Sequence, residues 1–391
     1  MTRLLFKENV LEKARQRVKL AFDDFPHIVC TFSGGKDSLA VLALALEEAE
    51  KRERKIALAF LDQEAEWDST IKEVKRWMSH PLIVPYWCRV PFILENSTGI
   101  LSDQSHYLVT YDPAKQSDWI HPYDSLAFYQ FPKYITSKFD KMRIGKKDSG
   151  MEMCNGKRYP GFYLALDALI HSACEHKRTA VFGGIRACEA LGRVRMCSHK
   201  FYRNMNGTYP ATNAFYRGPT CSEDTIMHIN PIYDWRFSDV WKYIYDKNLP
   251  YNILYDRLFQ LGLPHPQMRV SSVCHEMSLA WISILPEIEP DCWDRVQKRL
   301  SGTNTYKQSG ISCTCPDQFP SMFRSWADYR DYLFENLIPE ENKPALAKVL
   351  ARANSYMGTA LEIPAVKCQI TCILICDLVG VRMEKFIDTY R

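Results

Sequence analysis

The sequence contains no long apolar run, and nothing at its start resembles a secretion signal. A membrane-spanning helix needs about 20 consecutive apolar residues, and no segment of the 391 residues approaches that length. The first residues, MTRLLFKENVLEKARQR, lack the apolar core and the small-residue cleavage site of a signal peptide. We therefore expect a cytoplasmic protein that has no membrane-spanning part.

Concentrated charge of one sign is also missing. The formal net charge is +4 over the whole chain, which falls short of the basic face of a dedicated nucleic-acid binder. Hydrophobic residues make up 46% and charged residues 25%, as in ordinary globular proteins. A chain of this length can bury a core without disulfides and has room for two or three domains.

The 14 cysteines do not follow the pattern of a secreted disulfide scaffold. Several lie inside apolar runs, such as Cys30 in HIVCTF and Cys372 in ITCILIC. Buried thiols of this kind behave as small hydrophobic side chains. The cysteines therefore agree with the cytoplasmic expectation.

Two common phosphate-binding motifs are absent, and a third pattern is present. A Walker A loop needs G-x-x-x-x-G-K-[ST], but Lys36 is followed by Asp37, and no glycine stands five residues before Gly35. The dinucleotide fingerprint G-x-G-x-x-G is also absent. The pattern that is present consists of Ser33, Gly34, Gly35, Lys36, Asp37 and Ser38.

This SGGKDS loop has the chemistry of an anion site between a strand and a helix. Two glycines let the backbone approach a phosphate closely, and the following helix presents free N–H groups and its positive end. Lys36 adds a cation, and Asp37 could hold Mg²⁺ between phosphate oxygens. A simple turn is the alternative, but the buried strand before the loop and the helix after it favour the anion site.

Apolar runs and helical periodicities alternate along the first 265 residues. Such alternation predicts an α/β fold, in which helices cover both faces of a parallel sheet. Ser238 is the expected N-cap of the last of these helices. The expected strands are 27–32, 56–62, 82–87, 179–182 and 225–235, and the expected helices are 8–22, 37–52, 68–80, 163–176 and 237–248.

Residues 96–160 interrupt this alternation and are expected to form an insertion with a helix at 124–140. The segment carries a basic stretch at 141–147 and several aromatic residues: Trp119, Tyr123, Tyr129 and Tyr134. Aromatic rings could stack on bases while lysines contact phosphates, which makes nucleic acid one candidate acceptor. The alternative is that the aromatic residues form the insertion's own small core.

The last third of the chain is expected to be a mainly helical region, 266–391, that follows a nucleotide-binding domain at 1–265. The segment LGLPHPQ marks the boundary, because two prolines and a glycine interrupt the helical pattern there. The expected helices are 287–300, 323–337, 341–354 and 380–390.

The loop resembles the pyrophosphate loop of the ATP-pyrophosphatase (PP-loop) superfamily. Within it, the chain is similar to the phosphoadenosine-phosphosulfate reductase-like group, to which the ATP-binding subunit of sulfate adenylyltransferase is related. Three further segments carry the resemblance: FLDQEAEW at 60–67, GGIRACEALGR at 183–193 and NPIYDWRFSDVWKYI at 230–244. Together they extend it over residues 25–260.

The resemblance implies an adenine nucleotide α-hydrolase-like fold and a set of ATP contacts. These are the six loop residues together with Asp62, Gly183, Gly184, Arg186 and Glu189. Asp62 would meet the adenosine portion, and Lys36, Asp37 and Arg186 would be catalytic. The chain beyond residue 260 is similar to the immunoglobulin-binding-regulator branch of the group, which implies a ParB-like protein as a candidate partner.

A sulfonucleotide reductase needs a nucleophilic cysteine in an E-C-G-[LI]-H motif near its C-terminus, and this motif is absent. The most similar segment, Cys274-His275-Glu276, has its residues in another order. Without a positioned thiolate, reduction through a covalent thiosulfonate cannot proceed. We therefore expect ATP and Mg²⁺ to support adenylyl transfer or release of AMP and pyrophosphate. A reductase and a non-catalytic nucleotide-sensing regulator, acting with a protein or DNA partner, are the alternatives.

Two questions about side chains stay open in the sequence. Arg193 and Arg195 could reach the phosphates, or lie at the surface paired with Glu189. Cys274, Cys313 and Cys315 could hold zinc or an iron–sulfur cluster, although C-x-C is not a standard zinc spacing. A separate set recurs at every fourth residue and predicts a packed core helix: Cys368, Cys372 and Cys376.

Overall fold

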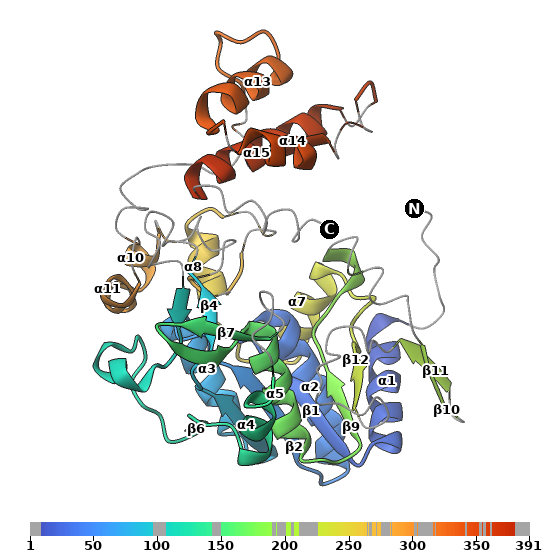
Figure 1. Cartoon of the computed structure of the whole chain (residues 1–391). Helices are drawn as coiled ribbons and strands as arrows, with labels where there is room; N and C mark the ends of the chain where they lie inside the picture. The colour runs from blue at the N-terminus through green and yellow to red at the C-terminus, as the bar shows by residue number, and fades with distance from the viewer. Residues whose placement is uncertain are drawn as a thin grey trace. The chain divides into compact units, whose positions relative to one another are not determined.

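The computed structural model describes two compact units of the chain, each with its own core (Figure 1). The first unit comprises Met1–Leu94, Leu108–Val273 and Leu285–Arg299, and the second comprises Glu95–Tyr107, Cys274–Ile284 and Leu300–Arg391. The described residues are 9–96, 107–142, 150–189, 193, 201–204, 207–210, 226–263, 265, 268–270, 272–274, 282, 284–300, 303, 316, 318–340, 342–351, 354, 357–359 and 362–379.

A six-stranded parallel sheet forms the centre of the first unit. Its order is β12-β9-β1-β2-β3-β6. The α/β prediction is confirmed, and strands such as β2 and β9 are buried along their whole length, as expected for a parallel sheet covered on both faces. The strands are β1 (His27–Thr31), β2 (Ile56–Leu61), β3 (Ile83–Cys88), β6 (Ala127–Phe128), β9 (Thr179–Phe182) and β12 (Ile226–Ile229).

Helices cover both faces of the sheet, and alternate residues of each strand face them. Ile28 and Cys30 of β1 belong to the core formed with α1, α2, α3 and α7, whereas Val29 belongs to the core formed with α5. This two-fold alternation accounts for strands that contain almost no polar residue. The helices are α1 (Val10–Asp24), α2 (Lys36–Lys51), α3 (Asp68–Met78), α5 (Phe162–Cys174) and α7 (Phe237–Asp246).

The strand order reverses direction at β1. From β1 the chain proceeds outward through β2, β3 and β6, and then returns to place β9 on the other side of β1. In an open parallel sheet, ligands bind at such a reversal, beside the carboxyl ends of the two diverging strands. The residues that follow β1 and β9 are the SGGKDS loop and the glycine pair Gly183-Gly184.

The segment predicted as an insertion, 96–160, contributes the strand β6 to the main sheet. The prediction was wrong in that it placed no strand of the sheet in this segment. β6 pairs in parallel with β3, and only α4 (Lys133–Phe139) is helical within the expected 124–140. Pro132 explains the shorter helix, because a proline disfavours helical backbone in the residue before it, Phe131. The rest of the segment contains β4 (Ile93–Glu95), β5 (Tyr107–Val109), η1 (Pro113–Asp118) and a hairpin of β7 (Met151–Cys154) and β8 (Lys157–Pro160).

The expected N-cap Ser238 was also wrong. α7 begins at Phe237, and Arg236 is its N-cap residue, because the Asp239 carboxylate accepts a hydrogen bond from the Arg236 amide at 2.7 Å. Ser238 therefore lies inside the first turn. A second hairpin, β10 (Phe201–Asn204) with β11 (Gly207–Pro210), precedes β12.

Packing places α10 (Leu285–Ile288) and α11 (Pro290–Arg299) with the first unit, although they follow the predicted boundary near residue 265. Ion pairs account for this placement. Arg295 of α11 pairs with Asp68 at 2.6 Å, and Arg299 pairs with the buried Glu64. The remaining helix of this unit is α8 (Leu254–Gln260), and a short η2 (Ala187–Glu189) follows β9.

The second unit is helical where it is described. Its core consists of Leu333, Ile338, Leu346, Val366, Ile370 and Ile373. The helix predicted around Cys372 is present, with Ile370 and Ile373 buried and Cys372 half-buried. The side chains of Cys368 and Cys376 lie outside the described residues, and so does the expected helix 380–390. The helices are α13 (Trp326–Leu337), α14 (Lys343–Leu350) and α15 (Glu362–Val379).

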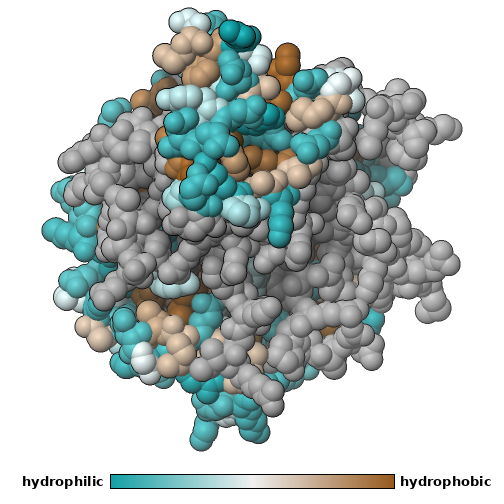
Figure 2. Space-filling model, turned by 45° about the horizontal axis from the view of Figure 1, so that its top comes forward, coloured by the Kyte–Doolittle hydropathy of each residue, from teal (hydrophilic) through white to brown (hydrophobic). Residues whose placement is uncertain are grey.

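The surface mixes polar and apolar side chains. On the face drawn in Figure 2, the coloured hydrophobic residues lie between hydrophilic ones and form no continuous apolar surface. Among the helices of the described ranges, none combines the length and the apolar character required to cross a bilayer.

Candidate functional site

The SGGKDS loop connects β1 to α2 in a conformation that only glycine adopts easily. Gly34 has a φ of +70°, in the left-handed region, and a Cβ there would lie 2.8 Å from Cγ2 of Thr70. Gly35 is the N-cap of α2 and supplies no side chain to cap it. The first amides of α2 are therefore not capped by Gly35, and the positive end of the helix faces the loop.

Two serines close the loop on itself. The Ser38 hydroxyl donates to the Gly35 carbonyl at 3.0 Å and accepts from the Ser33 amide at 3.2 Å. The two hydroxyl oxygens lie 3.1 Å apart. These contacts hold the loop in one shape, so that its amides and the side chains of Lys36 and Asp37 have defined positions.

Lys36 is almost completely buried, with 9% of its surface exposed. Its ammonium group pairs with Asp37 Oδ2 at 2.7 Å and lies over the rings of Phe237 and Tyr255, at 5.5 and 5.8 Å from the centroids. The Lys36 amide donates to the Tyr255 hydroxyl at 3.1 Å. The lysine is thus enclosed by residues from α7 and α8.

Arg186 reaches the same carboxylate from the segment that follows β9. Its Nε lies 2.6 Å from Asp37 Oδ1, and only 4% of the residue is exposed. Burial alone would lower the pKa of Arg186, but the charges of Asp37 and Glu189 outweigh it and raise that pKa. Asp37 therefore holds two cations, one on each carboxylate oxygen.

Glycines allow the two segments to approach. A Cβ on Gly184 would lie 2.8 Å from the Ser38 nitrogen and 2.9 Å from the Asp37 carbonyl carbon, so backbone packs directly on backbone. A Cβ on Gly183 would lie 2.9 Å from Oδ1 of Asn230. Larger residues at either position would push the arginine segment away from the loop.

Glu189 completes the charge pattern on the outer side. It pairs with Arg186 at 3.1 Å and also with Arg193. The sequence left two possibilities for Arg193, contact with the phosphates or a pair with Glu189, and the structure shows the pair with Glu189. Arg195 lies outside the described residues.

Several residues of the site were not predicted from the sequence. Tyr255 contacts the Lys36 amide, and Val270 Cγ2 would lie 3.4 Å from a Cβ on Gly35. The Asn252 amide group donates to Thr70 Oγ1 at 3.0 Å, beside Gly34. The contact between Lys36 and Tyr255 joins positions 219 residues apart, and no local motif marks the distant partners.

The family comparison agrees with this geometry. Residues 152–262 match the family model described as the phosphoadenosine phosphosulfate (PAPS) reductase domain. This part of the chain is therefore similar to the PAPS reductase domain. The matched range contains β9, Arg186 and α7, whereas the SGGKDS loop precedes it.

One curated relative spans nearly the whole chain. The chain is 24% identical over 368 residues to the uncharacterized protein YbdN of Escherichia coli (strain K12), which covers 91% of this chain and 82% of that protein. The similarity to YbdN therefore extends into the second unit, where the PAPS reductase model has no match.

Three solved structures show weaker overall likenesses. PAPS reductase from Candida auris, in a phosphate complex, is 17% identical with a TM-score of 0.34 and covers 70% of this chain and 98% of its own. FMN adenylyltransferase from Candida glabrata, with FAD and inorganic pyrophosphate, is 11% identical with a TM-score of 0.34, at 64% of each chain. The U34-tRNA thiolase NcsA from Methanococcus maripaludis, with its [4Fe-4S] cluster, is 12% identical with a TM-score of 0.27 and covers 85% and 89%.

Asp62, which follows β2, has no exposed surface. Its Oδ2 accepts hydrogen bonds from Trp87 at 2.9 Å and Arg89 at 2.8 Å, and its Oδ1 accepts from the Glu64 amide at 2.9 Å. The carboxylate is therefore committed to a buried network that ties β2 to β3. Its predicted contact with adenosine remains a prediction that requires this network to open.

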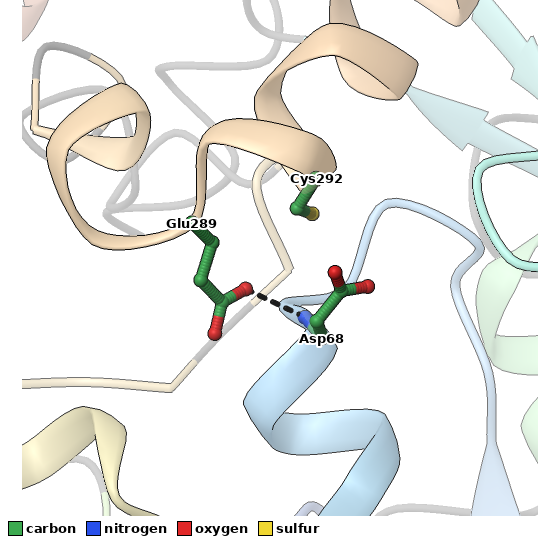
Figure 3. Close-up of side chains that lie close together, drawn as sticks. All are labelled: Asp68, Glu289 and Cys292. Atoms are coloured by element: carbon green, nitrogen blue, oxygen red, sulfur yellow. Dashed lines mark hydrogen bonds between the residues drawn. The ribbon is translucent and has the colours of Figure 1, made fainter.

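One group of side chains has the spacing of metal ligands: Asp68, Glu289 and Cys292 (Figure 3). Its carboxylates already have partners, however. Glu289 accepts from the amides of Asp68 and Ser69 at 2.7 and 3.0 Å and thereby caps α3, and Arg295 NH2 contacts both oxygens of Asp68. A helix N-terminus and an arginine repel a cation, so this cluster is best explained as a joint between α3 and α11.

The predicted zinc or iron–sulfur ligands are tested only in part. Cys313 and Cys315 lie outside the described residues. Cys274 is buried and, among the described side chains, belongs to no group with metal-ligand spacing. An exposed thiol that the sequence did not single out, Cys188, contacts Arg186 NH1 at 3.3 Å.

The aromatic residues of the segment predicted as an insertion pack mainly on one another. Trp119 stacks on Tyr129 at 5.5 Å, and Tyr123 stacks on the same ring at 4.9 Å. Tyr134 instead contacts His176. Of the basic stretch 141–147, residues 143–147 lie outside the described ranges. The self-packing favours the small-core interpretation over base stacking, and contact with nucleic acid stays a prediction.

Proposed function

We propose that the chain binds ATP at the SGGKDS loop and cleaves the bond between its α- and β-phosphates. One observation carries the proposal. The N-terminus of α2, Lys36 and Arg186 converge at the point where the strand order reverses, and one carboxylate, Asp37, positions both cations. Backbone amides and two fixed cations are the groups that stabilise a phosphate chain.

The chemistry follows from where negative charge develops. When an acceptor oxygen attacks the α-phosphorus, the bond to the bridging oxygen breaks and that oxygen carries the new charge of the departing pyrophosphate. Lys36 and the α2 amides lie on the loop side, and Arg186 approaches from β9. Since both cations are enclosed, their interaction with the developing charge is stronger than in water. With water as the acceptor, the products are AMP and pyrophosphate, whereas any other acceptor becomes adenylylated.

Magnesium fits the site as a companion of the nucleotide. Mg²⁺ prefers carboxylate and phosphate oxygens, and Asp37 is the carboxylate nearest the loop cations. Both Asp37 oxygens already contact a cation, so Asp37 would hold magnesium chiefly through the phosphates. When bound, the ion would neutralise charge on the pyrophosphate.

The reductase alternative draws support from the family match at 152–262, which describes a PAPS reductase domain. Such a reaction needs a cysteine that attacks the sulfonucleotide, and Cys188 is the exposed thiol beside Arg186. The regulator alternative, with a ParB-like or DNA partner, needs only binding. Product analysis separates the three.

The test uses ATP labelled at the α- and γ-phosphates, with Mg²⁺ and the full chain. We expect labelled AMP and pyrophosphate, and a decrease of about a hundredfold or more in Lys36→Ala and Arg186→Ala. Lys242→Ala, which removes an exposed cation paired with Asp246, is the matched control and should retain activity. ADP and phosphate as products would refute cleavage at the α–β bond, and tight ATP binding without any product would favour the regulator.

A further inference from the structure

A segment that follows α7 crosses the SGGKDS loop and contacts it at three places. Tyr255 accepts a hydrogen bond from the Lys36 amide, and Val270 lies against Gly35. Asn252 donates to Thr70 at 3.0 Å and lies 3.5 Å from the Gly34 carbonyl. Asn252, Tyr255 and Val270 therefore form part of the wall around the loop, although the sequence predicted no function for them.

The Tyr255 hydroxyl is oriented as a donor. Its oxygen accepts from the Lys36 amide at 3.1 Å, which leaves its hydrogen for another acceptor, and no described residue accepts that hydrogen. Burial raises the pKa of Tyr255, and the charge of Asp37 adds to this, so the hydroxyl keeps its proton at neutral pH. An amide that donates to a hydroxyl oxygen also strengthens that hydroxyl as a donor.

The second candidate ligand is Arg269, which lies in the same segment and whose charge acts on Tyr255. It is exposed between two buried neighbours, Met268 and Val270, and the second of these touches the loop. The charge of Arg269 acts on Tyr255, where it slightly opposes the rise of the tyrosine pKa. Unlike Arg186, Arg269 forms no ion pair with any residue in the described part of the chain.

We propose that Tyr255 and Arg269 are two further phosphate ligands, which extend the SGGKDS site with a hydroxyl donor and a free cation. Lys36 N–H donates to Tyr255, Tyr255 O–H donates to a phosphate oxygen, and the Arg269 guanidinium contacts the same phosphate chain. This inference rests on the proposed function, because it assigns both residues to the ligand of that site.

The test is the affinity of the full chain for inorganic pyrophosphate and for ATP, measured by calorimetry in variants that keep the fold. Tyr255→Phe removes only the hydroxyl, and we expect about tenfold weaker binding. Arg269→Ala should also weaken binding about tenfold and make the affinity less sensitive to salt. Tyr251→Phe, whose hydroxyl contacts Asp256 instead, and Arg76→Ala, on the last turn of α3, are the matched controls and should bind as the natural chain does.

The direction of the Tyr255→Phe effect decides between two roles. If the hydroxyl only occupied the Lys36 amide, its removal would free that amide and tighten pyrophosphate binding. Tighter or unchanged binding in Tyr255→Phe, or unchanged binding in Arg269→Ala, would therefore overturn the proposal. If the natural chain binds neither ATP nor pyrophosphate, the proposed function fails and this inference fails with it. If Lys36→Ala abolishes binding while Tyr255→Phe and Arg269→Ala bind as the natural chain does, only the inference fails.

Discussion

Individual residues of the loop are constrained by geometry more than by charge. Gly34 combines a left-handed backbone with the contact to Thr70, so a side chain there faces two separate costs. The left-handed backbone alone costs an alanine about 1 kcal/mol relative to glycine. The second cost comes from a methyl group that would lie 2.8 Å from Thr70 Cγ2.

We expect Gly34→Ala to lower the free energy of unfolding by about 2–4 kcal/mol, measured by urea denaturation. Gly156→Ala is the matched control, since Gly156 has a φ of +73° and a Cβ there meets nothing within 4 Å. It should lose only about 1 kcal/mol. Adding Thr70→Ser removes the clashing methyl but keeps the hydroxyl that Asn252 contacts, and should restore part of the loss. Equal losses in the two glycine variants would show that the Thr70 contact is unimportant.

At the scale of elements, α11 is attached to the loop after β2 through a buried ion pair. Arg299 NH2 contacts Glu64 Oε2 at 3.0 Å, and the Glu64 side chain has no exposed surface. Burial raises the pKa of Glu64, although Arg299 and the Tyr111 amide act in the opposite direction. The desolvation of the carboxylate therefore outweighs its stabilisation, and Arg299 is needed to keep it charged.

Removal of the arginine should leave an uncompensated buried charge. We expect Arg299→Met to destabilise the first unit by about 3–5 kcal/mol at pH 7.5, and Glu64→Gln/Arg299→Met to lose much less. Because the folded-state pKa of Glu64 in Arg299→Met lies further above its unfolded value, the loss should shrink as the pH falls and the carboxyl takes up a proton. Urea denaturation at pH 7.5 and pH 5.5 measures both effects, with Arg76→Ala as the surface control. A loss independent of pH would contradict this account.

For the whole molecule, the two units have separate hydrophobic cores. Ile370 is completely buried in the core of the second unit, and Ile28 is completely buried in the first. Deleting most of such a side chain costs about 2–5 kcal/mol. Because a chain with two cores need not unfold in one step, each substitution can act on its own transition.

We expect Ile370→Ala to lower the unfolding temperature of one calorimetric transition while the affinity for pyrophosphate stays unchanged. Ile28→Ala should lower the other transition and weaken pyrophosphate binding, because β1 leads directly into the SGGKDS loop. A single transition that both substitutions shift equally would show that the units unfold together.

Local patterns sufficed to predict most strands and helices around the main sheet of the first unit. Buried strands such as β1 and β2 are short apolar runs, and α2 and α3 carry their own periodicity, so each can be recognised without its neighbours. β6 was missed because a strand of two residues is too short to show an alternation of apolar and polar side chains. Only its pairing with β3 identifies it as a strand. The N-cap of α7 was misplaced by two positions, at Ser238 instead of Arg236, because the Asp239 side chain supplies the capping interaction.

The sequence by itself determined the α/β fold, the SGGKDS loop and the glycine–arginine segment after β9, since each is specified by adjacent residues. Only the tertiary structure decided that Asp37 holds Lys36 and Arg186 together, that Asp62 is committed to Arg89, and that α11 belongs with the first unit. It alone brought Tyr255 and Arg269 to the loop. The physical reason is that ion pairs and burial depend on distances between residues far apart in the chain, which no local spacing encodes.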